Sequence, residues 1–132
     1  IAIIVRVPLA SGLLTGKLNL QSIFPENDHR NYNINGDAFD IGETFSGVDY
    51  KKALDVVEEI KLLVPDNFSL SQLALKWILM HKEVSVVIPG AKNTDQALLN
   101  ISSSLMPPID GLMEAIENIY KSHLKTDIHH RW

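Results

Sequence analysis

Apolar residues along the chain fall into two short runs and several longer stretches with helical spacing. The runs, residues 1–7 and 84–88, are rich in β-branched side chains, which is typical of strands buried on both faces of a parallel sheet. Apolar positions recur at helical spacing over residues 48–64, 69–81 and 110–123. Strands that alternate with helices in this order predict parallel pairing through right-handed crossovers, and therefore an α/β fold.

The helix boundaries carry local signals. Pro65 ends the first helical stretch, and Ser69 with Gln72 forms a capping box that opens the second. Asp110 is placed to cap the last helix. Trp77 lies on the apolar face of the second helix, which indicates a core residue rather than a platform for a cofactor.

A long polar segment, residues 18–48, separates the first strand from the helices and is rich in Asn, Asp and Gly. A loop of this length inside a compact domain is usually functional or mobile. Residues 18–24 can add a short helix before Pro25. The run Asp28-His29-Arg30 is interpreted as a solvated group of charges rather than a catalytic cluster, because neighbours in sequence do not reliably face one another.

The turn after the second strand has the pattern of an anion site. Pro89 and Gly90 stop the strand, and Asn93 or Thr94 can cap a helix that follows. A helix N-terminus that follows a tight glycine turn points backbone N–H groups at one spot and suits a phosphate. Lys92 adds a mobile positive charge beside it.

Gln96 and Asn100 lie four residues apart and share a face of that helix. Their amides can contact a ligand held at the turn. The alternative is an ordinary turn between strand and helix that carries two surface amides.

The turn after the first strand is also a candidate site. Pro8 ends the strand, and Ser11, Gly12 and Gly16 make a flexible turn with small side chains. Arg6 is the one charge in an apolar strand, so it is either a paired structural arginine or faces a ligand. Ligands gather at the carboxyl ends of parallel strands, and both candidate turns follow a strand end, which favours phosphate binding.

Composition narrows the class of protein. The 132 residues match one domain, with 45% hydrophobic and 21% charged residues and a net charge of −4. No basic stripe indicates nucleic acid, and no apolar run approaches the roughly 20 residues of a membrane span. The absence of cysteine excludes disulfides and thiolate chemistry and fits a cytoplasmic protein. His129 and His130 lack further ligands at metal spacing, so we expect a tail docked by Trp132 instead of a metal site.

The sequence starts inside an apparent buried strand, with neither an initiator methionine nor a basic leader. A buried strand needs neighbours on both sides, and only one other convincing strand is present. We therefore expect the chain to be the latter part of a longer protein whose N-terminal half is missing. Pairing with another copy in a homo-oligomer is the alternative.

Three separated segments resemble the C-terminal portion of the aldo-keto reductases. They are residues 7–17, residues 71–79, and residues 88–92 together with Gln96 and Asn100. The resemblance implies a (β/α)8 TIM barrel, with residues 1–7 as its seventh strand and 84–88 as its eighth. Residues 1–132 are then the C-terminal part of one barrel domain, with a cofactor-side loop at 18–48 and a C-terminal helix and tail at 110–132.

The same resemblance implies reduction of small aldehydes or ketones by hydride transfer from NADPH, without a metal. It assigns cofactor contacts to three groups of residues: Pro8, Leu9, Ser11, Gly12, Leu14 and Lys17 at the pyrophosphate; Gly90, Ala91 and Lys92 at the 2′-phosphate; Gln96 and Asn100 at the ribose and adenine. Arg6 stands where many members stack an aromatic residue on nicotinamide, and Leu99 where many have an acid. The long loop resembles the segment that folds over the cofactor, where Arg30 can reach a phosphate.

The family's catalytic Asp, Tyr, Lys and His belong to the earlier half of the barrel, and no stretch of this chain matches their motifs. We therefore expect the chain alone to be inactive. A catalytically silent, NADP-binding regulatory subunit is the alternative to a piece of an enzyme. A third possibility is a helical interaction module whose strand-like runs are merely core.

Overall fold

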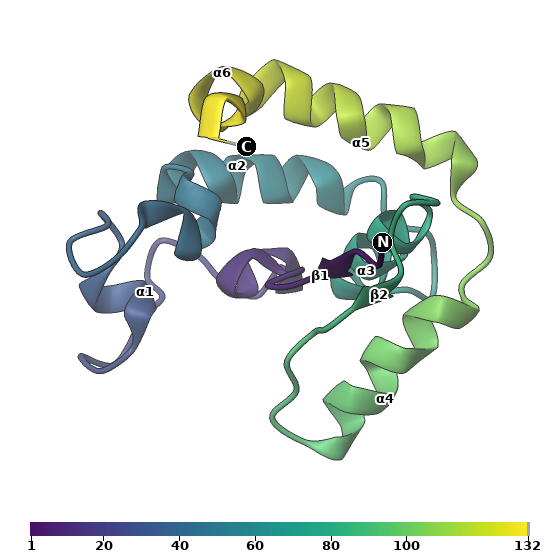
Figure 1. The fold of residues 1–132 in the computed structure, drawn as a ribbon, viewed down its shortest axis with the longest axis horizontal. Helices are drawn as coiled ribbons and strands as arrows, with labels where there is room; N and C mark the ends of the chain where they lie inside the picture. Colours follow the sequence, from purple (N-terminus) through teal and green to yellow (C-terminus); the bar gives the residue numbers. More distant parts are fainter. Residues whose placement is uncertain (132) are drawn as a thin grey trace.

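The computed structural model describes residues 1–131, a mixed α/β arrangement that is mostly helical with one two-stranded sheet (Figure 1). Figure 1 shows α2 and α5 side by side, with α4 projecting from the opposite side of the molecule. The strands are β1 (Ile4–Val5) and β2 (Val86–Val87). The helices are α1 (His29–Tyr32), α2 (Tyr50–Lys61), α3 (Leu70–Leu79), α4 (Thr94–Ser102), α5 (Asp110–His123) and α6 (Lys125–Ile128), and the 3₁₀ turns are η1 (Ala10–Thr15), η2 (Ile41–Glu43), η3 (Phe45–Gly47), η4 (Ser103–Leu105) and η5 (His129–Arg131).

The two strands pair in parallel, as the sequence predicts. Ile4 lies opposite Val86, and the Ile88 N–H donates to the Val5 carbonyl at 3.0 Å. This pairing argues against a helical interaction module, in which the two runs would only be core. It also places the carboxyl ends of β1 and β2 side by side, at one edge of the sheet.

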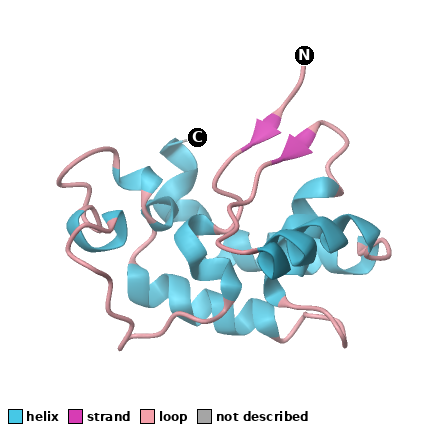
Figure 2. Cartoon of the chain, turned by 90° about the horizontal axis from the view of Figure 1, so that it is seen from below, coloured by secondary structure: helices cyan, strands magenta, loops and turns pink. Residues whose placement is uncertain are grey.

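The expected extent and burial of the strands are wrong. Each strand has two residues instead of five to seven, and Ile4 and Val86 are 59% and 42% exposed. Figure 2 shows the reason: the pair projects from the helices, so helices do not cover it on both faces. Within residues 1–131 no third strand pairs with either edge.

Helices α2 and α3 form as their sequence signals predict. Asp49 caps α2 by accepting the Lys52 N–H at 2.9 Å. Both halves of the capping box are present at α3, where the Ser69 side chain accepts the Gln72 N–H and the Gln72 side chain accepts the Ser69 N–H. The Gln72 amide also donates to Ser102 Oγ at 3.0 Å, which ties α3 to the end of α4.

The predicted cap of α5 is wrong by one position. Ile109 is the N-cap residue and makes no side-chain capping bond, while Asp110 is the first helical residue. Its carboxylate therefore stabilises the helix through the positive end of the helix dipole. The short helix expected over residues 18–24 is also absent; a turn forms there, because the Asn19 side chain accepts the Gln21 N–H and Ser22 Oγ accepts the Asn19 N–H.

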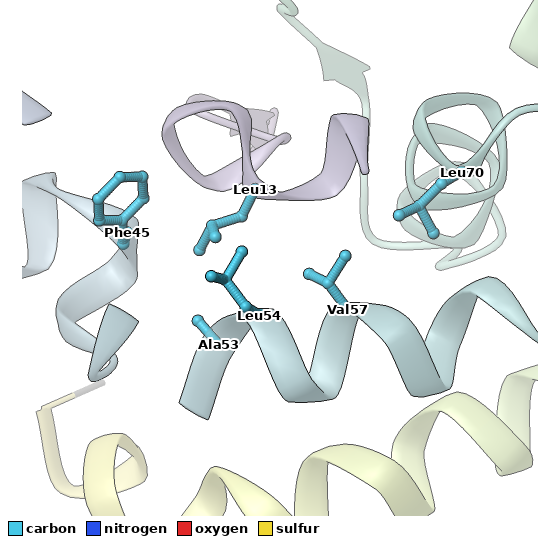
Figure 3. Packing of buried hydrophobic residues seen from close by; sticks show 6 residues of the cluster. All are labelled: Leu13, Phe45, Ala53, Leu54, Val57 and Leu70. Carbon is cyan, nitrogen blue, oxygen red and sulfur yellow. The ribbon is translucent and has the colours of Figure 1, made fainter. Parts of the chain in front are cut away.

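The apolar core joins η1, η3, α2 and α3 (Figure 3). Phe45 is 1% exposed, and its ring centroid lies 4.9 Å from that of Tyr50 and 6.0 Å from that of Phe24. The buried cluster consists of Leu13, Phe45, Ala53, Leu54, Val57 and Leu70. The long loop is thus attached to the helices through one of its own aromatic side chains.

A single buried amide organises the long loop. Asn33 is fully buried, and its Oδ1 accepts the N–H groups of Ala38 and Phe39 at 3.0 and 2.8 Å. Its Nδ2 donates to Thr44 Oγ1 at 3.1 Å. Because these bonds span eleven residues, the segment is an ordered compact loop.

Asp28 and Arg30 form a half-buried ion pair instead of a solvated group of charges, which corrects the sequence interpretation. The Asp28 carboxylate accepts from the Arg30 N–H, from Nε and from Nη2, at 2.9, 2.9 and 2.7 Å. These hydrogen bonds from Arg30 lower the pKa of Asp28 to about 2. The guanidinium also lies 4.5 Å above the Phe24 ring.

Replacing Asn33 by alanine should lower the free energy of unfolding by about 2–3 kcal/mol, because the N–H groups of Ala38 and Phe39 and the Thr44 hydroxyl lose their hydrogen bonds to this buried amide. Urea denaturation measures the change. Asn35→Ala, at an exposed position of the same loop, is the matched control and should stay within about 0.5 kcal/mol of the parent. Equal effects of the two substitutions would contradict the role given to Asn33.

The Asp28–Arg30 pair should make stability depend on pH in the acid range. The pKa of Asp28 falls from its ordinary value of 3.8 to about 2 on folding, so the pair stabilises the fold above pH 3.8 and its contribution is lost as the pH falls through about 2. Asp28→Asn should therefore be less stable than the parent at pH 5, and the difference should shrink toward pH 2. Melting temperatures across this range test the prediction, and a difference that grows on acidification would refute it.

Candidate functional site

The two candidate turns leave the sheet at the same edge. Because β1 and β2 run parallel and in register, residues 8–17 and residues 89–93 both start at carboxyl ends of strands. Among residues 1–131 no hydrogen bond or ion pair joins the two turns directly. The sheet therefore brings the turns to one edge, and each turn is held by contacts of its own.

The first turn has an unusual backbone. Ala10, Ser11 and Gly12 follow one another in the left-handed region, with φ values of 46°, 55° and 98°. Residues with side chains adopt this region at a cost of about 1–3 kcal/mol each, so the surroundings must hold them there. The Leu9 carbonyl accepts the N–H groups of Gly12 and Leu14 at 3.0 and 3.2 Å and closes the turn.

The side chain of Ser11 is engaged by the long loop. Its Oγ donates to the Glu43 carbonyl at 3.4 Å and accepts the Phe45 N–H at 3.3 Å. These two contacts help to hold Ser11 in its left-handed conformation. Contacts from Ser11 to a cofactor would then come mainly from its backbone.

Arg6 is paired with a carboxylate. Its Nη1 and Nη2 donate to the two carboxylate oxygens of Glu43, each at 2.8 Å. The guanidinium lowers the pKa of Glu43 through this hydrogen bonding. Of the two alternatives for Arg6, the structure therefore shows the paired arginine, and its 66% exposed side chain still lies at the edge of the turn.

Arg30 approaches the same turn from the other end of the loop. Its Nη1 lies 3.5 Å from the Ser11 carbonyl oxygen and 3.5 Å from the place where a Cβ on Gly12 would stand. A side chain on Gly12 would thus be in ordinary contact with the guanidinium, and it is the φ of 98° that favours glycine here. Two arginines, each with a carboxylate partner, flank the turn.

Pro8 and Leu14 lie in an apolar environment rather than beside the charged groups of the turn. Both line an apolar cavity of about 350 Å³ that lies between the first turn and the helices α2, α3 and α5. Trp77 also lines this cavity, and its Nε1 is buried without a hydrogen-bond partner in the described part of the chain. An apolar cavity disfavours a phosphate, so the side chains of Pro8 and Leu14 do not suit a pyrophosphate. Pro8 has no N–H to donate, and the Leu14 N–H already donates to the Leu9 carbonyl. Lys17 lies exposed just beyond the turn.

The second turn is pre-organised by the two predicted amides. Asn93 caps α4 by accepting the Gln96 N–H at 2.9 Å, and Gln96 Oε1 accepts the Lys92 N–H at 2.8 Å. Asn100 Nδ2 donates to the Gly90 carbonyl at 3.2 Å. Gln96 and Asn100 therefore have a structural role in this turn.

Space for a ligand remains at the second turn. A Cβ on Gly90 would meet no atom within 4 Å, and Ala91 and Lys92 are exposed. An exposed lysine charge beside the N-terminus of a nine-residue helix fits an anionic group such as a phosphate. The site residues named from the sequence thus fall into two groups at one edge of the sheet, and their contacts to a cofactor stay a prediction.

Glu43 is the residue that sequence reasoning missed. Thirty-seven positions separate it from Arg6, and it belongs to no motif. Only the folded loop places its carboxylate beside Arg6 and its carbonyl beside Ser11.

The remaining candidate chemistry is limited. Among residues 1–131 no group of three or more His, Cys, Asp or Glu side chains is arranged to hold a metal ion. His129 Nδ1 instead lies 2.9 Å from the Tyr120 hydroxyl. In that part of the chain no helix has both the length and the apolar character needed to cross a bilayer. The expected docking of Trp132 lies outside the described residues.

Comparison with known proteins agrees with the motifs at both turns. Residues 1–121 match the model of the Aldo/keto reductase family. Aldo-keto reductase str7 of Strobilurus tenacellus is 30% identical over 105 residues, which are 79% of this chain and 29% of that protein. The chain thus spans less than a third of this relative's length. On this evidence, the chain belongs to the aldo/keto reductase family.

Proposed function

We propose that the chain is the C-terminal, cofactor-binding part of an NADPH-dependent oxidoreductase that reduces aldehydes or ketones by hydride transfer. The observation that carries this proposal is the parallel register of β1 and β2, which sends both candidate turns to one edge of the sheet. Family membership supports the reaction class. The cysteine-free composition supports a cytoplasmic location.

We also propose that β1 and β2 are the last two strands of a (β/α)8 barrel. Both carry apolar side chains that stay exposed on the pair, among them Ile4, Val86 and Ile88. Each Å² of apolar surface removed from water stabilises by about 25 cal/mol, so further strands beside the pair would be favourable. In the proposed barrel, the strands beside this pair would come from residues other than those that the structure describes.

The chain's own residues would hold and orient the cofactor. Lys92 at the start of α4 would neutralise the 2′-phosphate, while Gln96 and Asn100 keep the turn around it in shape. The left-handed backbone at residues 10–12 would approach the pyrophosphate, with Lys17 supplying positive charge nearby. The guanidinium groups of Arg6 and Arg30, each paired with a carboxylate, would lie beside it. NADPH supplies the hydride when it is bound.

The proton donor of the reaction would come from outside this chain. Tyr50 Oη donates to the Asn19 carbonyl at 3.0 Å, and the Tyr120 hydroxyl contacts His129. These tyrosines support the fold. A catalytically silent, NADP-binding regulatory subunit would contain the same cofactor contacts, and only turnover separates it from an enzyme.

Lys92→Ala should weaken NADPH binding by the natural-length protein about 10- to 150-fold, since a charged hydrogen bond is worth about 1.5–3 kcal/mol. NADH lacks the 2′-phosphate, so its affinity should barely change. Lys82→Ala, an exposed lysine before β2, is the matched control. Fluorescence titration measures both affinities, and unchanged NADPH affinity in Lys92→Ala would show that the assignment is wrong.

The 132-residue chain by itself should not oxidise NADPH with aldehyde or ketone substrates, because no stretch of it matches the motifs of the family's catalytic Asp, Tyr, Lys and His. NADPH absorbance in the presence of a panel of carbonyl compounds tests this. Turnover by the isolated chain would contradict the prediction. Cofactor binding without turnover by the natural-length protein would favour the regulatory alternative.

A further inference from the structure

The C-terminal tail, residues 124–131, folds back over α2 toward the long loop (Figure 1). Asp127 pairs with Lys52 near the start of α2, and His123 Nε2 lies 2.9 Å from a carboxylate oxygen of Glu59 further along it. Ile128 is buried against the apolar cavity. These contacts hold the tail against α2 and so determine where Arg131 lies.

Arg131 contacts the loop at Asp40. Its Nη2 lies 3.2 and 3.5 Å from the two carboxylate oxygens of Asp40, across 91 positions in the sequence. Its Nη1 lies 3.1 Å from where a Cβ on Gly47 would stand. Because Gly47 has no side chain, the guanidinium can lie close to its backbone as well as to the Asp40 carboxylate.

Asp40 connects Arg131 with the first candidate turn through η2. The same carboxylate accepts the Gly42 N–H at 2.7 Å and so caps η2, which ends at Glu43. Glu43 then holds Arg6 with its carboxylate and Ser11 with its carbonyl. A single 3₁₀ turn therefore connects Arg131 with the residues that shape the proposed cofactor site.

We propose that Arg131 is a positioning residue for cofactor binding. It acts through Asp40, which fixes η2 so that Glu43 keeps Arg6 and the left-handed Ser11 in place. The proposal rests on the proposed cofactor function of the first turn. Because the Asp40 side chain is 73% exposed, the effect is modest and weakens with salt.

The test compares Arg131→Ala, Asp40→Asn and the double variant in the natural-length protein. Asn at position 40 keeps an oxygen for the Gly42 N–H and removes only the charge. Each single variant should weaken NADPH binding about three- to fivefold, and the double variant should be no weaker than either one. Amide exchange within residues 40–47 should rise, with the melting temperature nearly unchanged. Lys121→Ala, which breaks an exposed pair with Glu117 on α5, is the control and should change neither readout.

Several results would overturn the proposal. If amide exchange in residues 40–47 is unchanged in Arg131→Ala, the contact between tail and loop does not hold the loop in place. Faster amide exchange with unchanged NADPH affinity would show that Arg131 has no positioning role. Additive losses of NADPH affinity in the double variant would show the same. If the parent protein itself binds no NADP(H), the proposed function fails and the positioning role fails with it, while the exchange measurement still decides separately whether the tail holds the loop.

Discussion

The arrangement of this chain depends on one short parallel pairing between segments 82 residues apart. Four residues, Ile4 and Val5 against Val86 and Val87, set the register. This register sends the two turns that follow the strands off the same end of the sheet, and no direct hydrogen bond joins them within residues 1–131. Helix α3 also relates them, because Ser71 Oγ donates to the Leu14 carbonyl and the Gln72 amide donates to Ser102 Oγ at the end of α4.

Leu13 of the first turn and Phe45 of the long loop are buried in the core, and polar contacts add to this packing. Asn33 holds the long loop together from within, and the pairs of Arg6 with Glu43 and Arg30 with Asp28 approach the turn from two sides. Such contacts impose direction, which suits a turn whose residues adopt a costly backbone conformation.

Local signals explain what the sequence could predict. The capping box at Ser69 and Gln72 and the cap at Asn93 act within one helical turn, so their partners are readable without a fold. The pairing of Arg6 with Glu43 and the hub at Asn33 depend on how a long loop closes, and no short-range pattern encodes that closure. The prediction that the strands are buried was wrong for a related reason. Apolar composition indicates that burial of a strand is favourable, but whether the strand is buried depends on the elements that pack beside it.

The exposed strand pair has a consequence for the chain in isolation. Parallel strands with bare outer edges offer unsatisfied N–H and C=O groups, and apolar side chains such as Ile4 and Ile88 flank them. Such edges are templates for adding strands from other molecules. A preparation of these residues alone would therefore tend to self-associate, increasingly so at higher concentration.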